Sequence, residues 1–283
     1  MVSRARRPEL ERRASRSAMC QPITNPVARS LAALAVTALA SAACVEGAEG
    51  EGEGEGEPGQ ASASLRFGHT VDGAALALGT DTPHTNAAGN QFGVTRLSYF
   101  VSDVMVTLAD GATLAAPGGH YLDHDTPETL ALPLDGEAPA GALVSVAFVM
   151  GLPPALNDSG AFPSAPASSM EWPESMGGGY HFMKSEGKFI ADDGATESYA
   201  THSGALGGVD YSFAVTLDAS ALALDEGAST IDVEMHVDEW YTNPTDWDFN
   251  DYFPGGIMMN ADAQAILKAN GADVFALGAV THQ

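Results

Sequence analysis

The sequence predicts an all-β protein, a single antiparallel β-sandwich domain over residues 61–283 with a short C-terminal helix. Three observations lead to this fold class. Short apolar segments recur with turn signals between them, and only one segment has helical spacing. Gly and Pro are frequent, at 31 and 16 residues, as turn-rich β folds require. Apolar residues make up 45% of the chain, which is enough for a sizeable core, and no internal repeat divides it.

The strands are predicted in the order of their apolar segments. A first hairpin turns at Val71-Asp72-Gly73. In segment 94–108 the apolar residues change parity near Ser102-Asp103, which predicts a β-bulge or a break there. The remaining predicted strands are Leu143–Gly151, Gly179–Met183, Tyr211–Leu217 and Ile231–Trp240.

The one predicted helix covers Ala261–Ala269. Ala263, Ile266 and Leu267 fall on one side of it, and Gly271 is a typical stop signal.

Residues 1–43 are predicted to be a signal peptide, and Met19 is a better start than Met1. The apolar run 30–43 is too short to span a bilayer comfortably. Small residues precede Cys44, so we expect cleavage there and a lipid on the Cys44 thiol. An ordinary secretory signal cut near the same point is the alternative. The expected location is the periplasm or the outer membrane, with the lipid as membrane anchor.

Residues 44–60 alternate Glu and Gly and are predicted to form a disordered tether between the anchor and the domain. Cys20 and Cys44 are the only cysteines, and Cys20 lies inside the signal. The mature domain therefore has neither a disulfide nor a thiolate metal site.

Charge excludes nucleic acid as a partner. The formal net charge is −25, and residues 44–283 hold five basic groups against 35 acidic ones. Such a surface repels phosphate backbones.

The chain has no phosphate loop, dinucleotide-binding glycines, nucleophile elbow or zincin helix, and no acid–base constellation stands out. We therefore do not expect an enzyme. What remains in a cysteine-free exported domain is histidine, methionine and aromatic residues, and imidazole suits copper, zinc and nickel, with copper first in affinity. The histidines are His69, His84, His120, His124, His181, His202, His236 and His282. We discount His282 as a terminal residue, and His120 and His124 because they flank a loop.

Several motifs, in a fixed order, resemble the MbnP-like family of periplasmic copper-binding proteins, which is associated with methanobactin operons. Met170 and Trp172 precede a strand that starts at Gly179-Tyr180 and ends in Glu186-Gly187, and His202-x-Gly204 follows. The resemblance runs from about Leu65 to about Phe275. It also includes Phe67-Gly68-His69 and the segment from Asn86 to Phe92. Glu174 stands where the family has a second tryptophan, and the cysteines of four-cysteine relatives are absent.

The resemblance implies a copper store, scavenger or delivery protein with histidine ligands. Members are often encoded beside a di-haem cytochrome peroxidase-like partner, which can oxidise a tryptophan near the metal to kynurenine. Trp172 is the candidate here, and core packing is the alternative interpretation.

From the strand patterns we expect His69 and His202 to lie close together and to bind the metal. His181, His236 and Met183 are further candidate ligands, and His181 and Met183 share one side of their strand. For each histidine, the alternative is a hydrogen-bonded residue on the rim of the sandwich.

Two other functions compete with copper storage or delivery. The domain could be a structural or adhesion lipoprotein that has lost the metal, or a copper enzyme. Asp246, Asp248 and Asp251 have a spacing that faintly resembles a calcium loop. The glycine and the terminal glutamate of that loop are missing, so we interpret them as a solvated acidic loop.

Overall fold

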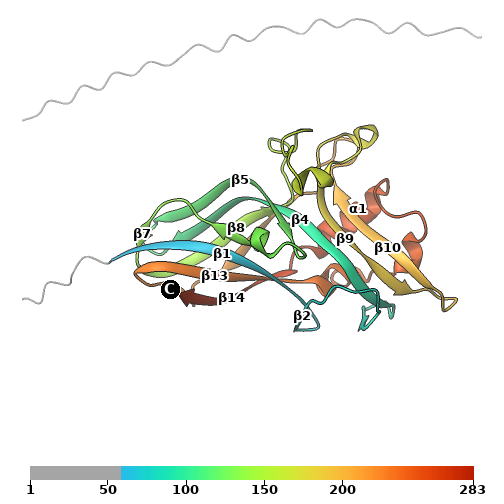
Figure 1. Ribbon diagram of the computed structural model, residues 1–283, viewed down its shortest axis with the longest axis horizontal. Helices are drawn as coiled ribbons and strands as arrows, with labels where there is room; N and C mark the ends of the chain where they lie inside the picture. Colours follow the sequence, from blue (N-terminus) through green and yellow to red (C-terminus); the bar gives the residue numbers. More distant parts are fainter. Residues whose placement is uncertain (1–58) are drawn as a thin grey trace, which may run out of the picture. The chain divides into compact units, whose positions relative to one another are not determined.

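The computed structural model describes residues 59–283. The predicted signal peptide, Cys44 and nearly all of the tether lie outside the described residues. Two curled β-sheets and one short helix make up the described part, which confirms the all-β sandwich (Figure 1). No helix among residues 59–283 is both long and apolar enough to cross a membrane.

The first sheet is centred on β1 (Gln60–Val71). It has the order β14-β13-β1-β2, with β13 (Gly227–His236), β14 (Phe275–His282) and β2 (Ala74–Ala75). The short strands β6 (Ala131–Pro133) and β7 (Ala138–Pro139) also pair with β1. The β1–β13 pair is parallel, so the expectation of a purely antiparallel sandwich is wrong at this pair. Strands far apart in the chain have no hairpin to force opposite directions.

The second sheet is built around the long strand β4 (Gln91–Leu108). Along one edge of β4, β9 (His181–Ile190) pairs with its first half and β8 (Gly141–Met150) with its second half. On the other edge lies β5 (Thr113–Asp123). The outer strands are β10 (Thr196–Gly204) beside β9, and β11 (Phe213–Asp218) beside β8. The short strands β3 (His84–Thr85) and β12 (Ala223–Leu224) complete the sheet.

The predicted irregularity in the long strand is confirmed. The pairing of β4 with β5 shifts between Ser102 and Val104, and Asp103 has a φ of 50°. The extra residue moves the apolar side chains from one parity to the other, as the sequence pattern required.

The helix α1 (Ala261–Asn270) matches its prediction. The Asn260 side chain accepts a hydrogen bond from the Ala263 amide at 3.1 Å and caps the start, and Gly271 follows the end. Short 3₁₀ turns occur at η1 (Pro127–Leu130), η2 (Ala167–Met170), η3 (Glu174–Met176), η4 (Val237–Tyr241) and η5 (Phe249–Tyr252). The predicted strand 231–240 ends early, because its last residues belong to η4.

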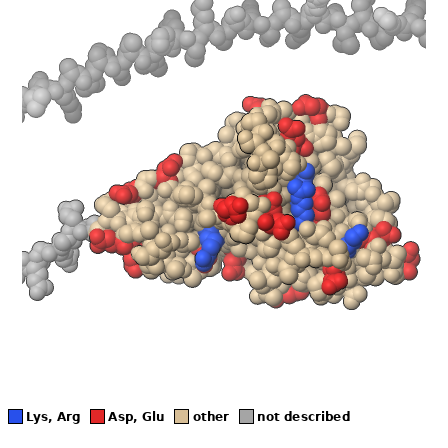
Figure 2. Space-filling model, viewed as in Figure 1, with Lys and Arg blue, Asp and Glu red and all other residues tan. Residues whose placement is uncertain are grey.

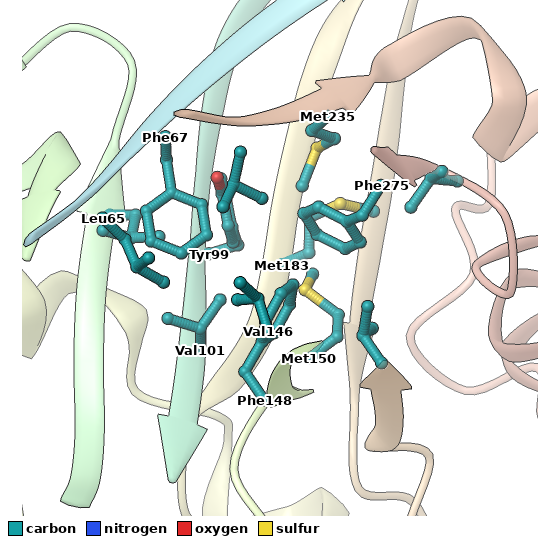
Figure 3. Close-up of a cluster of buried hydrophobic side chains, with 14 of the residues drawn as sticks. Leu65, Phe67, Tyr99, Val101, Val146, Phe148, Met150, Met183, Met235 and Phe275 are labelled. Carbon is teal, nitrogen blue, oxygen red and sulfur yellow. The ribbon is translucent and has the colours of Figure 1, made fainter. Parts of the chain in front are cut away.

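Two apolar clusters hold the sheets and the loops in place. The main core fills the space between the sheets, and Figure 3 shows Phe67, Tyr99 and Phe148 there with the thioethers of Met150, Met183 and Met235. In a smaller cluster, Leu152, Met170 and Tyr180 of segment 151–180 pack with Phe100 of β4 and Phe182 of β9. This second cluster fixes the loop that carries Met170 and Trp172.

Candidate metal centre

The structure brings histidines together in two pairs. The β9–β10 pair consists of His181 and His202, and the β1–β5 pair consists of His69, on β1, and His124, just after β5. No group of three or more His, Cys, Asp or Glu side chains arranged to hold a metal is present within residues 59–283. A metal in either pair would therefore take two imidazoles from this part of the chain.

The β9–β10 pair lies where β9 begins and β10 ends. The two ring centroids are 5.0 Å apart, with the ring planes at 89°. His202 is opposite Lys184 in the ladder, and the register shifts between Ser203 and Gly204, so that Gly204 faces His181. The shift interrupts the alternation of faces, because a bulged strand changes where its side chains point.

Each imidazole of the β9–β10 pair has one nitrogen anchored. His181 Nδ1 donates to the Met170 carbonyl at 2.9 Å, since a carbonyl can only accept. His202 Nε2 donates to Glu186 Oε1 at 2.8 Å. In their neutral forms, His181 Nε2 and His202 Nδ1 keep their lone pairs. Metal-binding histidines typically hold their other N–H on a carbonyl or carboxylate in this way.

The electrostatics of the β9–β10 pair keep His181 neutral. Burial, with the nearby Lys184 charge, lowers the pKa of His181 to about 3. The hydrogen bond from His202 is the main cause that lowers the pKa of Glu186. Arg96 Nη1 lies 3.9 Å from Glu186 Oε1 and adds to this effect. His181 is therefore uncharged at neutral pH, and the carboxylate that accepts from His202 is ionised.

Trp172 packs directly against the β9–β10 pair. Its ring centroid is 4.7 Å from that of His181, at 71°, and the side chain is only 2% exposed. The ring also covers Gly204, where a Cβ atom would lie 2.7 Å from Trp172 Cε3. The indole Nε1 has no hydrogen-bond partner within the described residues. Trp172 is thus buried and in contact with the pair.

The β1–β5 pair joins the two sheets, because His69 is on β1 of the first sheet and His124 follows β5 of the second. The Nδ1 atoms of His69 and His124 face each other at 2.9 Å, so one of them donates to the other. His69 Nε2 is 3.0 Å from the hydroxyl of Tyr99, which is fully buried on β4. Burial, and then the nearby His124, lowers the pKa of His69 to about 3. Partial burial also lowers the pKa of His124.

The positions of His69 and His124 correct two expectations. His69 and His202 lie in different pairs, because His69 contacts His124 and His202 contacts His181. His69 points into the core between the sheets, whereas His202 lies on the face of the second sheet that carries Glu186. His124, discounted as a loop residue, is the partner of His69.

The other candidate ligands lie apart from both pairs. At the end of β13, His236 Nδ1 lies 3.0 Å from the hydroxyl of Thr70 on β1. This hydrogen bond fits the interpretation of His236 as a residue on the rim of the sandwich. Met183 is fully buried in the main core, as Figure 3 shows, and not beside His181. In the acidic loop, Asp248 caps η5 by accepting from the Asn250 amide at 2.9 Å.

Glu186 is a site residue that the sequence analysis missed in this role. In the sequence it stands out only as part of the Glu186-Gly187 motif. On β9 it pairs with Ala200, two residues before His202, which places both side chains on one face. Predicting β10 as a strand would have revealed this relation.

Three comparisons relate the chain to known proteins. The sequence model of the MbnP family matches residues 60–259, which is well over half of the chain. No curated protein matches the chain. A solved structure, MbnP from Methylosinus trichosporium, is similar over 68% of this chain and 80% of its own, with 16% identity and a TM-score of 0.43. The matched residues include every strand from β1 to β13 and both histidine pairs, and the chain belongs to the MbnP family.

Proposed function

We propose that this chain is an extracytoplasmic copper-binding protein that stores, scavenges or delivers the ion without catalysing a reaction. One observation carries the proposal: the separate motifs of the family resemblance meet at the β9–β10 pair. The Met170 carbonyl anchors His181, Trp172 packs on both His181 and Gly204, and His202 faces His181.

The donor set of the β9–β10 pair fits copper. It offers two imidazoles, each with one nitrogen already held, and copper stands highest among the divalent ions that imidazole binds. His181 through Nε2 and His202 through Nδ1 would hold the ion. Glu186, hydrogen-bonded to His202, would raise the basicity of that ligand.

The β1–β5 pair is a second candidate centre for the same function. Its two Nδ1 atoms already converge at 2.9 Å, and an ion between them would replace the hydrogen that they share. His124 is half-buried, so this pair is not sealed inside the core.

The lipid anchor at Cys44, the extracytoplasmic location and the di-haem cytochrome peroxidase-like partner belong to the same proposal. Their support is the sequence pattern and the family resemblance. The contact of Trp172 with His181 supports Trp172 as the residue that such a partner would oxidise.

Copper binding by alanine variants tests the proposal and assigns the centre. We expect His181→Ala and His202→Ala to weaken copper binding by orders of magnitude in competition with a chelator, because each removes one of two imidazoles. His69→Ala and His124→Ala report on the β1–β5 pair in the same titration. His236→Ala is the matched control, since it removes a rim histidine.

Copper binding as tight as the parent's in all four site variants would reject histidine ligation at these pairs. Purified parent protein that takes up no copper would favour a structural or adhesion role instead.

A further inference from the structure

One side chain of α1 reaches the free edge of β10. Gln264 is fully buried. Its Oε1 accepts from the Gly204 amide at 3.2 Å, and its Nε2 donates to the His202 carbonyl at 2.8 Å and to the Ile257 carbonyl at 3.3 Å.

The hydrogen bonds of Gln264 take the place of those that a neighbouring strand would make with the outer edge of β10. β10 is the outermost strand of its sheet, so its outward backbone groups have no strand beside them. In an extended chain, the carbonyl of one residue and the amide of the second residue after it point to the same side. The Gln264 amide binds this pair of groups, on either side of Ser203.

The groups that Gln264 holds belong to the proposed copper centre. His202 supplies an imidazole, and Gly204 supplies the surface on which Trp172 packs. The pairing with β9 shifts register between Ser203 and Gly204, so the regular ladder stops fixing the backbone at this point.

We infer that Gln264 is a positioning residue of the β9–β10 pair, which sets the backbone of His202 and Gly204 from the helix side. The inference rests on the proposed copper function for its consequence in binding. Its structural part, the hold on residues 202–204, can be tested without metal.

Asn270 provides a matched control on the same helix. It is also fully buried, and its Nδ2 donates to the carbonyls of Trp240 at 3.0 Å and Thr245 at 2.8 Å. Its Oδ1 also accepts from the Thr245 amide at 3.2 Å, so replacing it removes three hydrogen bonds, as many as Gln264 makes, and none of them involves β10. A merely structural role for Gln264 predicts the same behaviour from both variants.

The experiment compares Gln264→Met with Asn270→Leu in the full chain. In the metal-free protein, we expect Gln264→Met alone to speed hydrogen exchange at the Gly204 amide and to shift the imidazole nitrogen resonances of His181 and His202. With copper, we expect Gln264→Met to weaken binding about 10–100-fold, as outer partners of ligands do, and Asn270→Leu to leave it unchanged.

Equal effects of the two variants on exchange, resonances and copper affinity would overturn the inference. If Gln264→Met does not fold, Gln264→Glu keeps the shape and the acceptor for Gly204 but cannot donate to His202. The same shifts and weakened binding are then expected, and their absence rejects the role. Should His181→Ala and His202→Ala both keep full copper affinity, the proposed function fails, and the metal-free measurements still decide the positioning role.

Discussion

Gly204→Ala tests the contact between Trp172 and the end of β10. The added Cβ atom would lie 2.7 Å from Trp172 Cε3 and 2.9 Å from Cζ3, closer than carbon atoms approach. Trp172 cannot retreat easily, because its amide donates to the Gly179 carbonyl at 2.8 Å and its ring lies on His181. Overpacking of a buried site costs about 1–3 kcal/mol. For a domain of this size, each kcal/mol lowers Tm by roughly 2–4 °C.

Thermal unfolding of the parent, Gly204→Ala and Gly141→Ala measures this cost. Gly141 starts β8, and an added Cβ there meets no atom within 4 Å, so its variant should unfold like the parent. A double variant with Trp172→Phe should recover part of the loss, since the smaller ring leaves room for the methyl group. If Gly204→Ala is as stable as Gly141→Ala, with unchanged near-ultraviolet circular dichroism, Trp172 does not pack on Gly204 and the described site is wrong.

Three further results are expected. Glu186→Gln should weaken copper binding about 10–100-fold in a chelator competition, because the carboxylate that orients His202 is lost. In the parent, the ionised Glu186 stabilises the folded state at neutral pH, and this contribution is lost as pH falls through its lowered pKa. Urea unfolding at several pH values should show that the variant lacks this contribution. His181 has a pKa of about 3 when folded and an ordinary one near 6.5 when unfolded, so stability should fall as pH drops from 6.5 towards 3, and less steeply in His181→Gln; equal slopes would contradict its burial as a neutral group. Met183→Ala should cost about 2–5 kcal/mol of stability in urea and leave copper affinity unchanged, since Met183 belongs to the core; a drop in affinity alone would restore it as a ligand.

The strands that the sequence predicted are those with strong apolar alternation. The long strand β4, its bulge at Asp103 and the helix α1 follow from local pattern, because the spacing of their apolar residues marks the face that packs on the main core. β10 was missed because its sequence from Thr196 to Gly204 is polar, as edge strands often are. β10 is held by its pairing with β9 and by the hydrogen bonds from Gln264 of α1, and its own sequence does not predict these contacts.

The histidine pairing could not be derived from spacing. His69 and His124 are 55 residues apart, and they meet only because β5 returns along β4 while β1 lies in the opposite sheet. His181 and His202 are both candidates from the sequence, but the strand pattern placed His202 beside His69 and not beside His181. Side-chain alternation gives the face of a residue within one sheet, and it does not say which sheets face each other.

The surroundings of the β9–β10 pair arise because one edge of β4 changes its partner strand between Val101 and Tyr99. β8 leaves the edge of β4 opposite Val101, and β9 joins the same edge opposite Tyr99, so segment 151–180 must loop out between them. The loop packs on the smaller apolar cluster and returns with Met170 and Trp172 beside the first residue of β9. On the outer strand the break falls at Gly204, and the absent Cβ gives the indole its place there. A continuous β8–β9 strand would carry the same histidines on a regular ladder, with neither the Met170 carbonyl nor Trp172 within reach of His181.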